Sequence, residues 1–263
     1  MIKNFKPRIY QEAILNTAAL KNTLVVLPTG LGKTFIFLML AALRLKNYPN
    51  SKILLLGPTK PLIDQYFRTF QKHFEIKEED MAIFTGEVKP KDRIQLWKNS
   101  KIIFSTPQSI ENDLLSNRIS LERVSLLGID EAHRAVSNYS YVWVAKQYYK
   151  TANYPRILGL TASPGSDMEK ITEVCKNLFI EEIEVRTEED SDVKPYVQET
   201  KIVWVEVELD ENLKKIKNLF EKASKERLKR LRTWGIIKKP INYVNKTKKI
   251  KMQGHLHKDA VSA

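Results

Sequence analysis

Two polar segments of this sequence carry residue types that bind and activate phosphates, and each follows an apolar, strand-like run. The first segment, residues 28–34, follows the run Thr23–Leu27 and leads into a helix-like stretch. The second is the carboxylate pair Asp130-Glu131 at the end of residues 125–129. Backbone N–H groups of a glycine-containing loop before a helix bind phosphate oxygens, and carboxylates bind Mg²⁺. The two segments together predict a site for a nucleoside triphosphate and Mg²⁺.

Residues of the glycine-containing loop have distinct predicted roles in phosphate binding. Glycines at positions 30 and 32 permit backbone conformations that side chains forbid. Lys33 is predicted to reach the β- and γ-phosphates, and the Thr34 hydroxyl is predicted to ligate Mg²⁺. The strict phosphate-loop pattern has a further glycine where this chain has Leu27. The predicted nucleotide-binding residues of the loop are Thr29, Gly30, Leu31, Gly32, Lys33 and Thr34.

The carboxylate pair supplies the other half of the predicted site. Asp130, at the end of a buried strand, is predicted to hold Mg²⁺ through water, and Glu131 to polarise the attacking water. The alternative for this pair is two solvated acids after a strand.

Several further segments, in this order, give the chain a resemblance to a known family. Residues 130–133, Asp-Glu-Ala-His, resemble motif II of DEAH-type superfamily 2 helicases, and residues 29–34 resemble motif I. A segment near the N-terminus resembles the upstream element that contacts adenine, through Arg8, Tyr10 and Gln11. Four further motifs have counterparts in this order: motif Ia in residues 58–62, Ib in 85–86, Ic in 105–108 and III in 161–164.

The resemblance implies roles for individual residues. It implies catalytic roles for Lys33, Asp130 and Glu131, and contact with the purine for Arg8 and Gln11. Three residues would couple the nucleotide site to the nucleic acid: His133, Thr161 and Ser163. Six residues would contact the nucleic acid: Thr59, Lys60, Thr85, Gly86, Thr106 and Gln108.

Plainer structural roles remain open for several of these motifs. Residues 58–61 could form a simple strand-to-helix turn, and residues 85–86 a plain turn. Thr106 could be a helix N-cap with Pro107 at the first helical position, which leaves phosphate contact possible. His133 could be a packed or surface histidine.

The wider context, residues 130–135 followed by residues 139–144, is similar to the archaeal Hef and eukaryotic FANCM helicases, which act on branched DNA. The resemblance implies an ATP-dependent DNA helicase motor that uses ATP and Mg²⁺. Two alternatives remain: a duplex-RNA helicase of the sensor or Dicer group, and a non-catalytic nucleic-acid-binding module. Family members also carry a second RecA-like domain with motifs IV to VI. Those motifs are not found in this sequence, so a truncated motor with weak hydrolysis of its own is expected.

Apolar strands alternate with longer helical patterns over the first 190 residues, which predicts a parallel sheet covered on both faces. The family resemblance makes this an α/β, RecA-like, P-loop NTPase fold. Each predicted strand ends at one of the motifs, at the sheet edge where open α/β sheets bind ligands. The predicted strands are Thr23–Leu27, Lys52–Leu56, Met81–Phe84, Lys101–Phe104, Ser125–Ile129 and Arg156–Leu160. The predicted helices are Tyr10–Ala19, Lys33–Leu45, Pro61–His73, Arg93–Lys98, Tyr141–Tyr149 and Ser166–Leu178.

The remainder of the chain is predicted to leave this domain and become basic. Residues 191–209 are predicted to be a linker followed by an exit strand over Gln198–Leu209. Residues 210–263 are predicted to begin a basic helical insertion, with Asp210 as the N-cap of a helix to Trp234, and to end in a flexible tail. Residues 211–263 carry 16 of the 44 basic and four of the 31 acidic residues, a net charge of +12 out of +13. Such a helix would contact phosphates without reading bases.

Composition excludes several other classes of protein. The single cysteine, Cys175, excludes an intramolecular disulfide, and no Cys/His spacing typical of a metal site occurs. The longest apolar run, Phe35–Leu43, is far shorter than the ~20 residues that cross a bilayer. The N-terminus shows no secretory signal. The sequence therefore predicts a soluble, cytoplasmic protein with no membrane partner.

Overall fold

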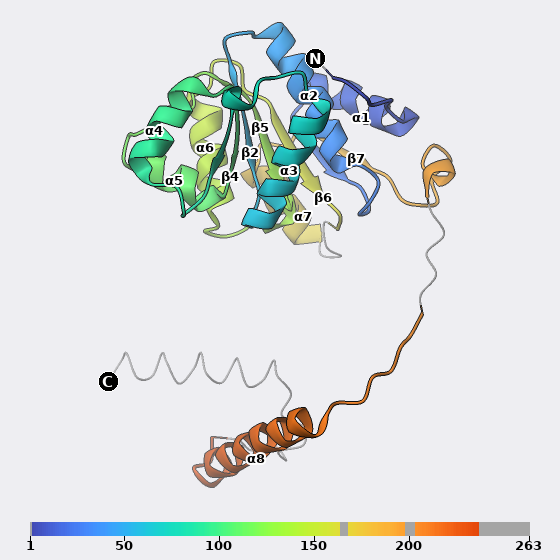
Figure 1. Ribbon diagram of the computed structural model, residues 1–263, viewed down its shortest axis with the longest axis vertical. Coiled ribbons are helices and arrows are strands. Elements are labelled where there is room, and N and C mark those ends of the chain that lie inside the picture. The colour runs from blue at the N-terminus through green and yellow to red at the C-terminus, as the bar shows by residue number, and fades with distance from the viewer. Residues whose placement is uncertain (1, 164–167, 198–202, 237–263) are drawn as a thin grey trace. The chain divides into compact units, whose positions relative to one another are not determined.

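Seven strands form one sheet in which every pairing is parallel (Figure 1). The computed structural model describes residues 2–163, 168–197 and 203–236. The strand order is β3-β4-β2-β5-β6-β1-β7, so the third strand of the chain and the last lie at opposite edges. The strands are β1 (Thr23–Val26), β2 (Lys52–Leu56), β3 (Met81–Phe84), β4 (Ile102–Ser105), β5 (Val124–Asp130), β6 (Ile157–Thr161) and β7 (Glu182–Val185).

Helices cover both faces of the sheet because the inner strands are apolar on both sides. Helices α1, α2 and α3 share one core cluster with one face of the sheet. Helices α4, α5, α6 and α7 share a second cluster with the opposite face (Figure 1). The helices are α1 (Ile9–Leu20), α2 (Lys33–Asn47), α3 (Lys60–His73), α4 (Pro90–Asn99), α5 (Pro107–Leu115), α6 (Ser140–Thr151) and α7 (Met168–Asn177). Three short 3-10 helices add to them, over Glu78–Asp80, Ala132–Arg134 and Lys194–Tyr196.

Gly128, in the middle of β5, leaves room for a side chain of the helix that packs on this strand. A Cβ atom built there would lie 2.3 Å from Cε2 of Phe37, a buried side chain of α2. The close approach of α2 to β5 therefore requires a residue without a side chain. This contact fixes the helix that follows the phosphate loop against the strand that carries the carboxylate pair.

All six strands predicted within the first 190 residues occur, with ends that differ from the prediction by at most one residue. The predicted helices occur as well, although the start of the last one, residues 166–167, lies outside the described residues. The start of α5 was predicted, with Thr106 as N-cap and Pro107 as the first helical residue, but the helix was given no range, and β7 was missed. Strand β7 alternates Glu and apolar residues, and its Ile183 and Val185 are 42% and 50% exposed, as suits an edge strand.

The first compact unit covers Met1–Glu199, so it extends past the predicted boundary at residue 190. Val193 is fully buried, and Tyr196 and Val197 pack against the core cluster that includes α1. Tyr196 also meets the ring of Tyr10 edge-on, at 5.8 Å between centroids. Residues expected to be a linker therefore close the core beside α1.

The second compact unit begins at Thr200 and contains α8 (Glu211–Thr233). The predicted exit strand is wrong over Val203–Leu209, where the structure has no regular secondary structure. Its alternating residues suit a strand, but the described residues offer them no pairing partner, and Trp204 is 91% exposed. The N-cap prediction is confirmed, because the Asp210 carboxylate accepts from the backbone N–H groups of Asn212 and Leu213. The predicted tail falls mostly on residues 237–263, outside the described residues.

No helix within the described ranges is both long and apolar enough to cross a membrane.

Candidate functional site

Apart from Arg8 and Gln11, which lie at the start of α1, the predicted site residues lie at or just after the carboxyl ends of strands. The strand order sorts these residues into two groups. The nucleotide residues follow β1 and β5, and β6, which leads to Thr161 and Ser163, lies between those two strands. The nucleic-acid residues follow β2, β3 and β4, which form the other half of the sheet. The structure therefore places the two predicted functions side by side on one edge.

The loop after β1 has the backbone shape that a phosphate cradle requires. Gly30 and Gly32 have φ values of +86° and +82°, in the left-handed region that favours glycine. No atom lies within 4 Å of a Cβ built on Gly30, so the loop is open there. A Cβ on Gly32 would lie 2.5 Å from Nε2 of Gln11. The Lys33 ammonium donates to the carbonyl oxygens of Leu27 (2.7 Å) and Pro28 (3.3 Å), inside the loop.

A cleft of about 500 Å³ brings the loop and the carboxylate pair together. Its walls come from the phosphate loop, the start of α2, one side of α3 and the end of β5. The lining residues include seven of the predicted residues: Thr29, Gly30, Gly32, Lys33, Thr34, Asp130 and Glu131. Leu31 is buried in the core and contributes its backbone, since its carbonyl accepts from the Tyr10 hydroxyl at 2.6 Å.

Burial shifts the pKa values of two oppositely charged side chains in this cleft, Asp130 and Lys33. Asp130 is 5% exposed, and burial raises the pKa of its carboxyl to about 6, with the neighbouring Glu131 charge adding to the shift. Burial also lowers the pKa of Lys33, and the charges of Asp130 and Glu131 partly offset that effect. The cleft therefore holds a carboxyl group and an ammonium group that are both partly desolvated, which is typical of sites that bind a charged ligand.

Asp130→Asn should stabilise the ligand-free protein at pH 8. The pKa of Asp130 is raised from 3.8 to about 6 on folding, so the free energy of unfolding falls as pH rises between those values. At 1.36 kcal/mol per pKa unit, the ionised carboxylate costs about 1–3 kcal/mol above pH 6. Urea unfolding without nucleotide or Mg²⁺ should show this gain at pH 8 and almost none at pH 4.

The matched control for that prediction is Asp92→Asn, since Asp92 is an exposed acid on α4. It should give no gain that grows between pH 4 and pH 8. An equal gain for Asp130→Asn at both pH values would assign the effect to packing and contradict the ionisation argument.

Glu131 and the predicted coupling residues form a connected polar chain. Glu131 has a left-handed backbone, φ 51°, which is uncommon for a residue other than glycine and is typical of functional sites. His133 Nδ1 lies 3.3 Å from a Glu131 carboxylate oxygen and 3.1 Å from the Thr161 hydroxyl. The Thr161 hydroxyl in turn donates to the Ser163 carbonyl at 2.9 Å. Pro164, the last residue of this motif, lies outside the described residues.

Two buried tyrosines that the sequence analysis missed support Asp130. The Tyr141 hydroxyl donates to the Asp130 backbone carbonyl at 2.8 Å. The Tyr66 hydroxyl interacts with both Thr34 and Asp130, and burial raises the pKa of Tyr66 so that it keeps its proton. Tyr66 lies on α3, whose cleft-lining residues Gln65, Arg68, Thr69 and Lys72 share one face of the helix. That helical spacing was the available signal.

Arg8 and Gln11 are not among the residues that line the cleft. Gln11 is 1% exposed, and its amide is directed at the carbonyls of Leu31 and Gly32, each at 3.4 Å. The Arg8 guanidinium donates to the Tyr10 hydroxyl and lies over the Tyr196 ring, 5.0 Å from its centroid. Their contact with a purine therefore stays a prediction. In the structure, Gln11 bonds to the predicted phosphate loop directly, and Arg8 bonds to Tyr10, whose hydroxyl donates to the Leu31 carbonyl.

An aromatic group beside the cleft was also missed from the sequence. Phe35, directly after the phosphate loop, stacks on Phe5 with 4.2 Å between ring centroids and meets His73 edge-on at 5.1 Å. Phe35 and His73 both line the cleft. These side chains come from the N-terminal segment, α2 and α3, and no local pattern links them.

The six predicted nucleic-acid residues lie at three neighbouring strand ends. Thr59 is the residue before α3 and Lys60 its first residue, after β2, whereas Thr85 and Gly86 follow β3 and Thr106 and Gln108 follow β4. Gly86 is exposed, and Thr85 is 5% exposed. Lys60 forms an ion pair with Glu87 of the β3–α4 loop.

Thr106 occupies the N-cap position of α5, with Pro107 as the first helical residue. Its side chain does not cap the backbone and instead contacts the Ser109 hydroxyl at 2.9 Å. The first backbone N–H groups of α5 therefore receive no bond from this side chain, which keeps phosphate contact available there.

The sequence matches the family described as DEAD/DEAH box helicase over residues 8–171. The chain belongs to the DEAD/DEAH box helicases. It is 42% identical over 255 residues to a Methanocaldococcus jannaschii protein provisionally named an ATP-dependent RNA helicase, a match covering 97% of this chain and 32% of the relative. It is 38% identical over 215 residues to the Drosophila melanogaster DEAD-box ATP-dependent DNA helicase Fancm, covering 80% of this chain and 14% of Fancm.

The DEAD/DEAH box helicase chain is also similar to a solved structure. The crystal structure of the Pyrococcus furiosus Hef helicase domain matches it with a TM-score of 0.74 and 44% identity, covering 98% of this chain and 55% of that one. The predicted RecA-like fold and the predicted likeness to Hef and FANCM are confirmed. The chain spans at most about a third of the two curated relatives, so the activities in their names belong to much longer proteins.

Proposed function

We propose that this chain is the ATP-binding motor domain of a DNA helicase or translocase, coupling hydrolysis of Mg²⁺-bound ATP to movement on branched or forked DNA. One observation carries the proposal: Lys33 and Thr34 share a cleft with Asp130 and Glu131, in a chain of the DEAD/DEAH box helicase family. Family membership supports the use of ATP, and the contents of the cleft support the residue roles.

The donor set suits Mg²⁺, which prefers oxygen ligands and usually keeps several waters beside one or two carboxylates and substrate phosphates. The Thr34 hydroxyl and the Asp130 carboxylate are the proposed ligands, and Tyr66 interacts with both. Among the described residues, no group of three or more His, Cys, Asp or Glu side chains is placed to hold a metal ion. The cleft therefore suits a metal shared with phosphates. When bound, Mg²⁺ would neutralise developing charge on the phosphate oxygens.

Within this cleft, each proposed catalytic residue has a distinct task. The backbone N–H groups of residues 30–34 and the Lys33 ammonium would hold the phosphates in line for attack. Glu131 would orient the attacking water and accept its proton, since its carboxylate lines the cleft beside the buried Asp130. Contacts run from Glu131 through His133 to Thr161. Through them, nucleotide binding or hydrolysis in the cleft would change the position of the segment that follows β6.

A second RecA-like domain is proposed to complete the motor. In related NTPases, an arginine supplied to the γ-phosphate accelerates hydrolysis by about 10³–10⁵-fold. The match to the Hef helicase domain covers 55% of that chain, which supports a motor larger than the described unit. Slow hydrolysis by this chain alone is therefore the expected behaviour.

The alternative substrate is duplex RNA, because the Methanocaldococcus jannaschii relative is named for RNA. DNA is favoured because the Fancm relative is named a DNA helicase and the sequence context is similar to Hef and FANCM. Phosphate contacts by Lys60 and backbone N–H groups would not distinguish the two, since they carry no base information.

Competition binding separates these substrates. Labelled forked DNA bound to the chain should be displaced by unlabelled forked DNA at a lower concentration than by duplex RNA, at one fixed salt concentration. Equal or stronger displacement by duplex RNA would favour the RNA helicase. ATP turnover with DNA and a supplied second motor domain tests the remaining alternative, and no turnover under those conditions would indicate a non-catalytic binding module.

A further inference from the structure

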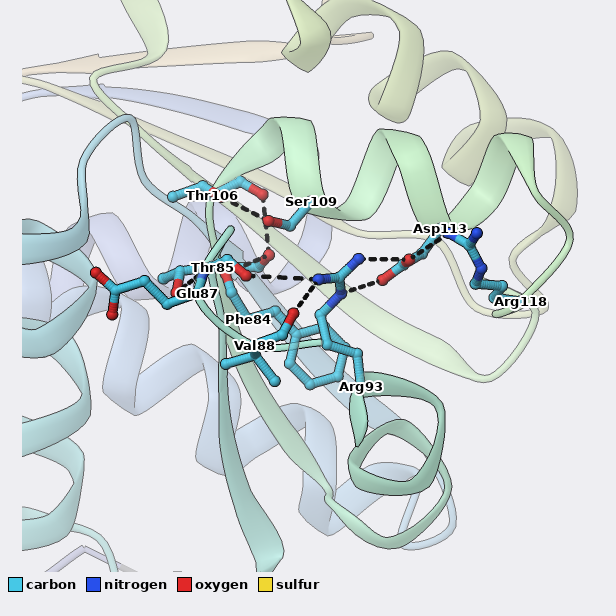
Figure 2. A network of polar contacts seen from close by, with 10 residues as sticks. Phe84, Thr85, Glu87, Val88, Arg93, Thr106, Ser109, Asp113 and Arg118 are labelled. Atoms are coloured by element: carbon cyan, nitrogen blue, oxygen red, sulfur yellow. Dashed lines mark hydrogen bonds and ion pairs between the residues drawn. The ribbon is translucent and has the colours of Figure 1, made fainter. Parts of the chain in front are cut away.

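A buried ion pair joins two helices beside the predicted nucleic-acid residues (Figure 2). Arg93 on α4 and Asp113 on α5 are 5% and 0% exposed. The guanidinium donates twice to the carboxylate, from Nε at 2.6 Å and from Nη2 at 2.7 Å. This forked geometry fixes both the distance and the angle between the two side chains. The pair therefore holds α4 and α5 in one relative position.

The third nitrogen of Arg93 holds the loop between β3 and α4. Nη1 donates to the backbone carbonyl of Val88 and, at 3.5 Å, to that of Thr85 (Figure 2). The loop closes on itself as well, because the Val88 N–H donates to the Thr85 carbonyl at 3.2 Å. Gly86, at the tip of this loop, is exposed and has open space before it. Arg93 thus fixes the backbone of residues 85–88 from inside the protein.

Asp113 connects the same cation to the other predicted contact segment. It lies on α5, the helix that begins after Thr106. The Thr106 N–H and the Ser105 hydroxyl both donate to the Phe84 carbonyl at 3.0 Å, which links the end of β4 to the end of β3. The β3–α4 loop and the start of α5 are therefore held as one rigid edge, with Arg93 at its centre (Figure 2).

A buried ion pair of this kind is a poor source of stability. Its desolvation cost offsets most of the attraction, and apolar replacements of similar volume are often neutral. What the arginine fork provides is geometry, because five donors in a plane set the positions of several acceptors together. Here the acceptors are a carboxylate and two loop carbonyls.

We propose that Arg93 and Asp113 are positioning residues that set the spacing between the Thr85-Gly86 loop and the start of α5, so that both contact phosphates of one nucleic-acid strand. This inference rests on the proposed function. It concerns the ends of β3 and β4, and neither Arg93 nor Asp113 is among the residues that line the nucleotide cleft. Loss of the pair therefore weakens binding to the nucleic acid and leaves Mg²⁺-ATP affinity unchanged.

The main variant is Arg93→Lys, which keeps a positive charge but cannot reach both the carboxylate and the loop carbonyls. Its matched control is Arg118→Lys. Arg118 donates to the same carboxylate, at 3.2 Å, from a side chain that is 34% exposed, and within the described residues no hydrogen bond joins that side chain to the β3–α4 loop. The two variants change the same residue type around the same acid.

The measurement is binding of the whole chain to fluorescein-labelled oligothymidylate across a series of salt concentrations. Arg93→Lys should bind about tenfold more weakly at low salt, the size of one missing charge-assisted hydrogen bond. Its slope of log affinity against log salt should equal the parent's, because the lost contacts come from neutral backbone N–H and hydroxyl groups and a positive charge remains at position 93. The basic residues 211–263 contribute equally to parent and variants, so the difference in affinity isolates the sheet edge. Arg118→Lys should match the parent in both quantities.

A second variant covers the case in which Arg93→Lys does not fold. The double variant Arg93→Met/Asp113→Leu replaces the pair with apolar side chains and is expected to fold. It should bind Mg²⁺-ATP like the parent and bind oligothymidylate with the same reduction of affinity. A pair with only a structural role would change the unfolding temperature without changing the affinity of the folded chain for oligothymidylate.

Two outcomes overturn this inference. One is parental affinity for oligothymidylate in the double variant. The other is an equal weakening of oligothymidylate binding in Arg118→Lys. A parent chain that fails to bind the oligonucleotide would overturn the proposed function, and this inference with it.

Discussion

Glu131→Gln should lower the rate of ATP hydrolysis by about 10²–10⁴-fold, the usual contribution of a general base. Glutamine keeps the size of the side chain and can still accept a bond from His133, but it cannot take a proton from water. Mg²⁺-ATP affinity should stay within a factor of about two, because Lys33, Thr34 and Asp130 remain. The variant should therefore bind nucleotide and fail to turn it over.

Single-turnover hydrolysis in the presence of DNA and a supplied second motor domain measures this effect, with nucleotide binding measured by calorimetry. Glu122→Gln is the matched control, since Glu122 is an exposed acid that does not line the cleft. It should leave both quantities unchanged. Hydrolysis by Glu131→Gln at the parental rate would place the base elsewhere.

Lys33→Ala should weaken Mg²⁺-ATP binding by about 10–100-fold, since charge-assisted hydrogen bonds are worth about 1.5–3 kcal/mol. Burial already lowers the pKa of Lys33, and its ammonium donates to the carbonyls of Leu27 and Pro28. Phosphate oxygens would be far better partners for this charge. Removing the ammonium should not unfold the loop, because its hydrogen bonds are to two carbonyls near the open cleft.

Fluorescence titration with a labelled ATP analogue and Mg²⁺ tests this prediction. Lys98→Ala is a suitable control, because Lys98 is exposed on α4, away from the cleft. It should bind nucleotide with the parental affinity. If Lys33→Ala binds Mg²⁺-ATP as tightly as the parent, residues 29–34 are not the phosphate loop.

The strands were predictable because their apolar runs are short, bounded and buried on both faces. β2 and β3 have the predicted bounds, β1 differs by one residue at one end, and β4, β5 and β6 differ by one residue at both ends. Edge elements were harder, since β7 reads as an acidic, alternating segment rather than a buried run. Val203–Leu209 shows the opposite failure: alternation indicates a segment fit for a strand, but a strand also needs a backbone partner. Pairing partners lie far away in sequence and leave no local signal.

The polar network around Arg93 shows a second kind of limit. Arg93 and Asp113 are 20 residues apart on different helices, and each reads as an ordinary charged residue of a helix. Only packing shows that both are buried and that the guanidinium also reaches the β3–α4 loop. Tyr66 is similar, since its contact with Thr34 and Asp130 depends on how α3 lies against the sheet.

The sequence by itself determined the positions of the predicted phosphate loop and the carboxylate pair and the order of the motifs, because each is a local pattern at the end of an apolar strand. It also determined the basic charge of residues 211–263 and the N-cap at Asp210. The tertiary structure alone decided which motifs meet. Strand order places β6 between β5 and β1, so His133 reaches Thr161, and it gathers the ends of β2, β3 and β4 into a separate group. Strand order depends on long-range backbone pairing and on the packing of helices over both faces, which no local stretch of sequence encodes.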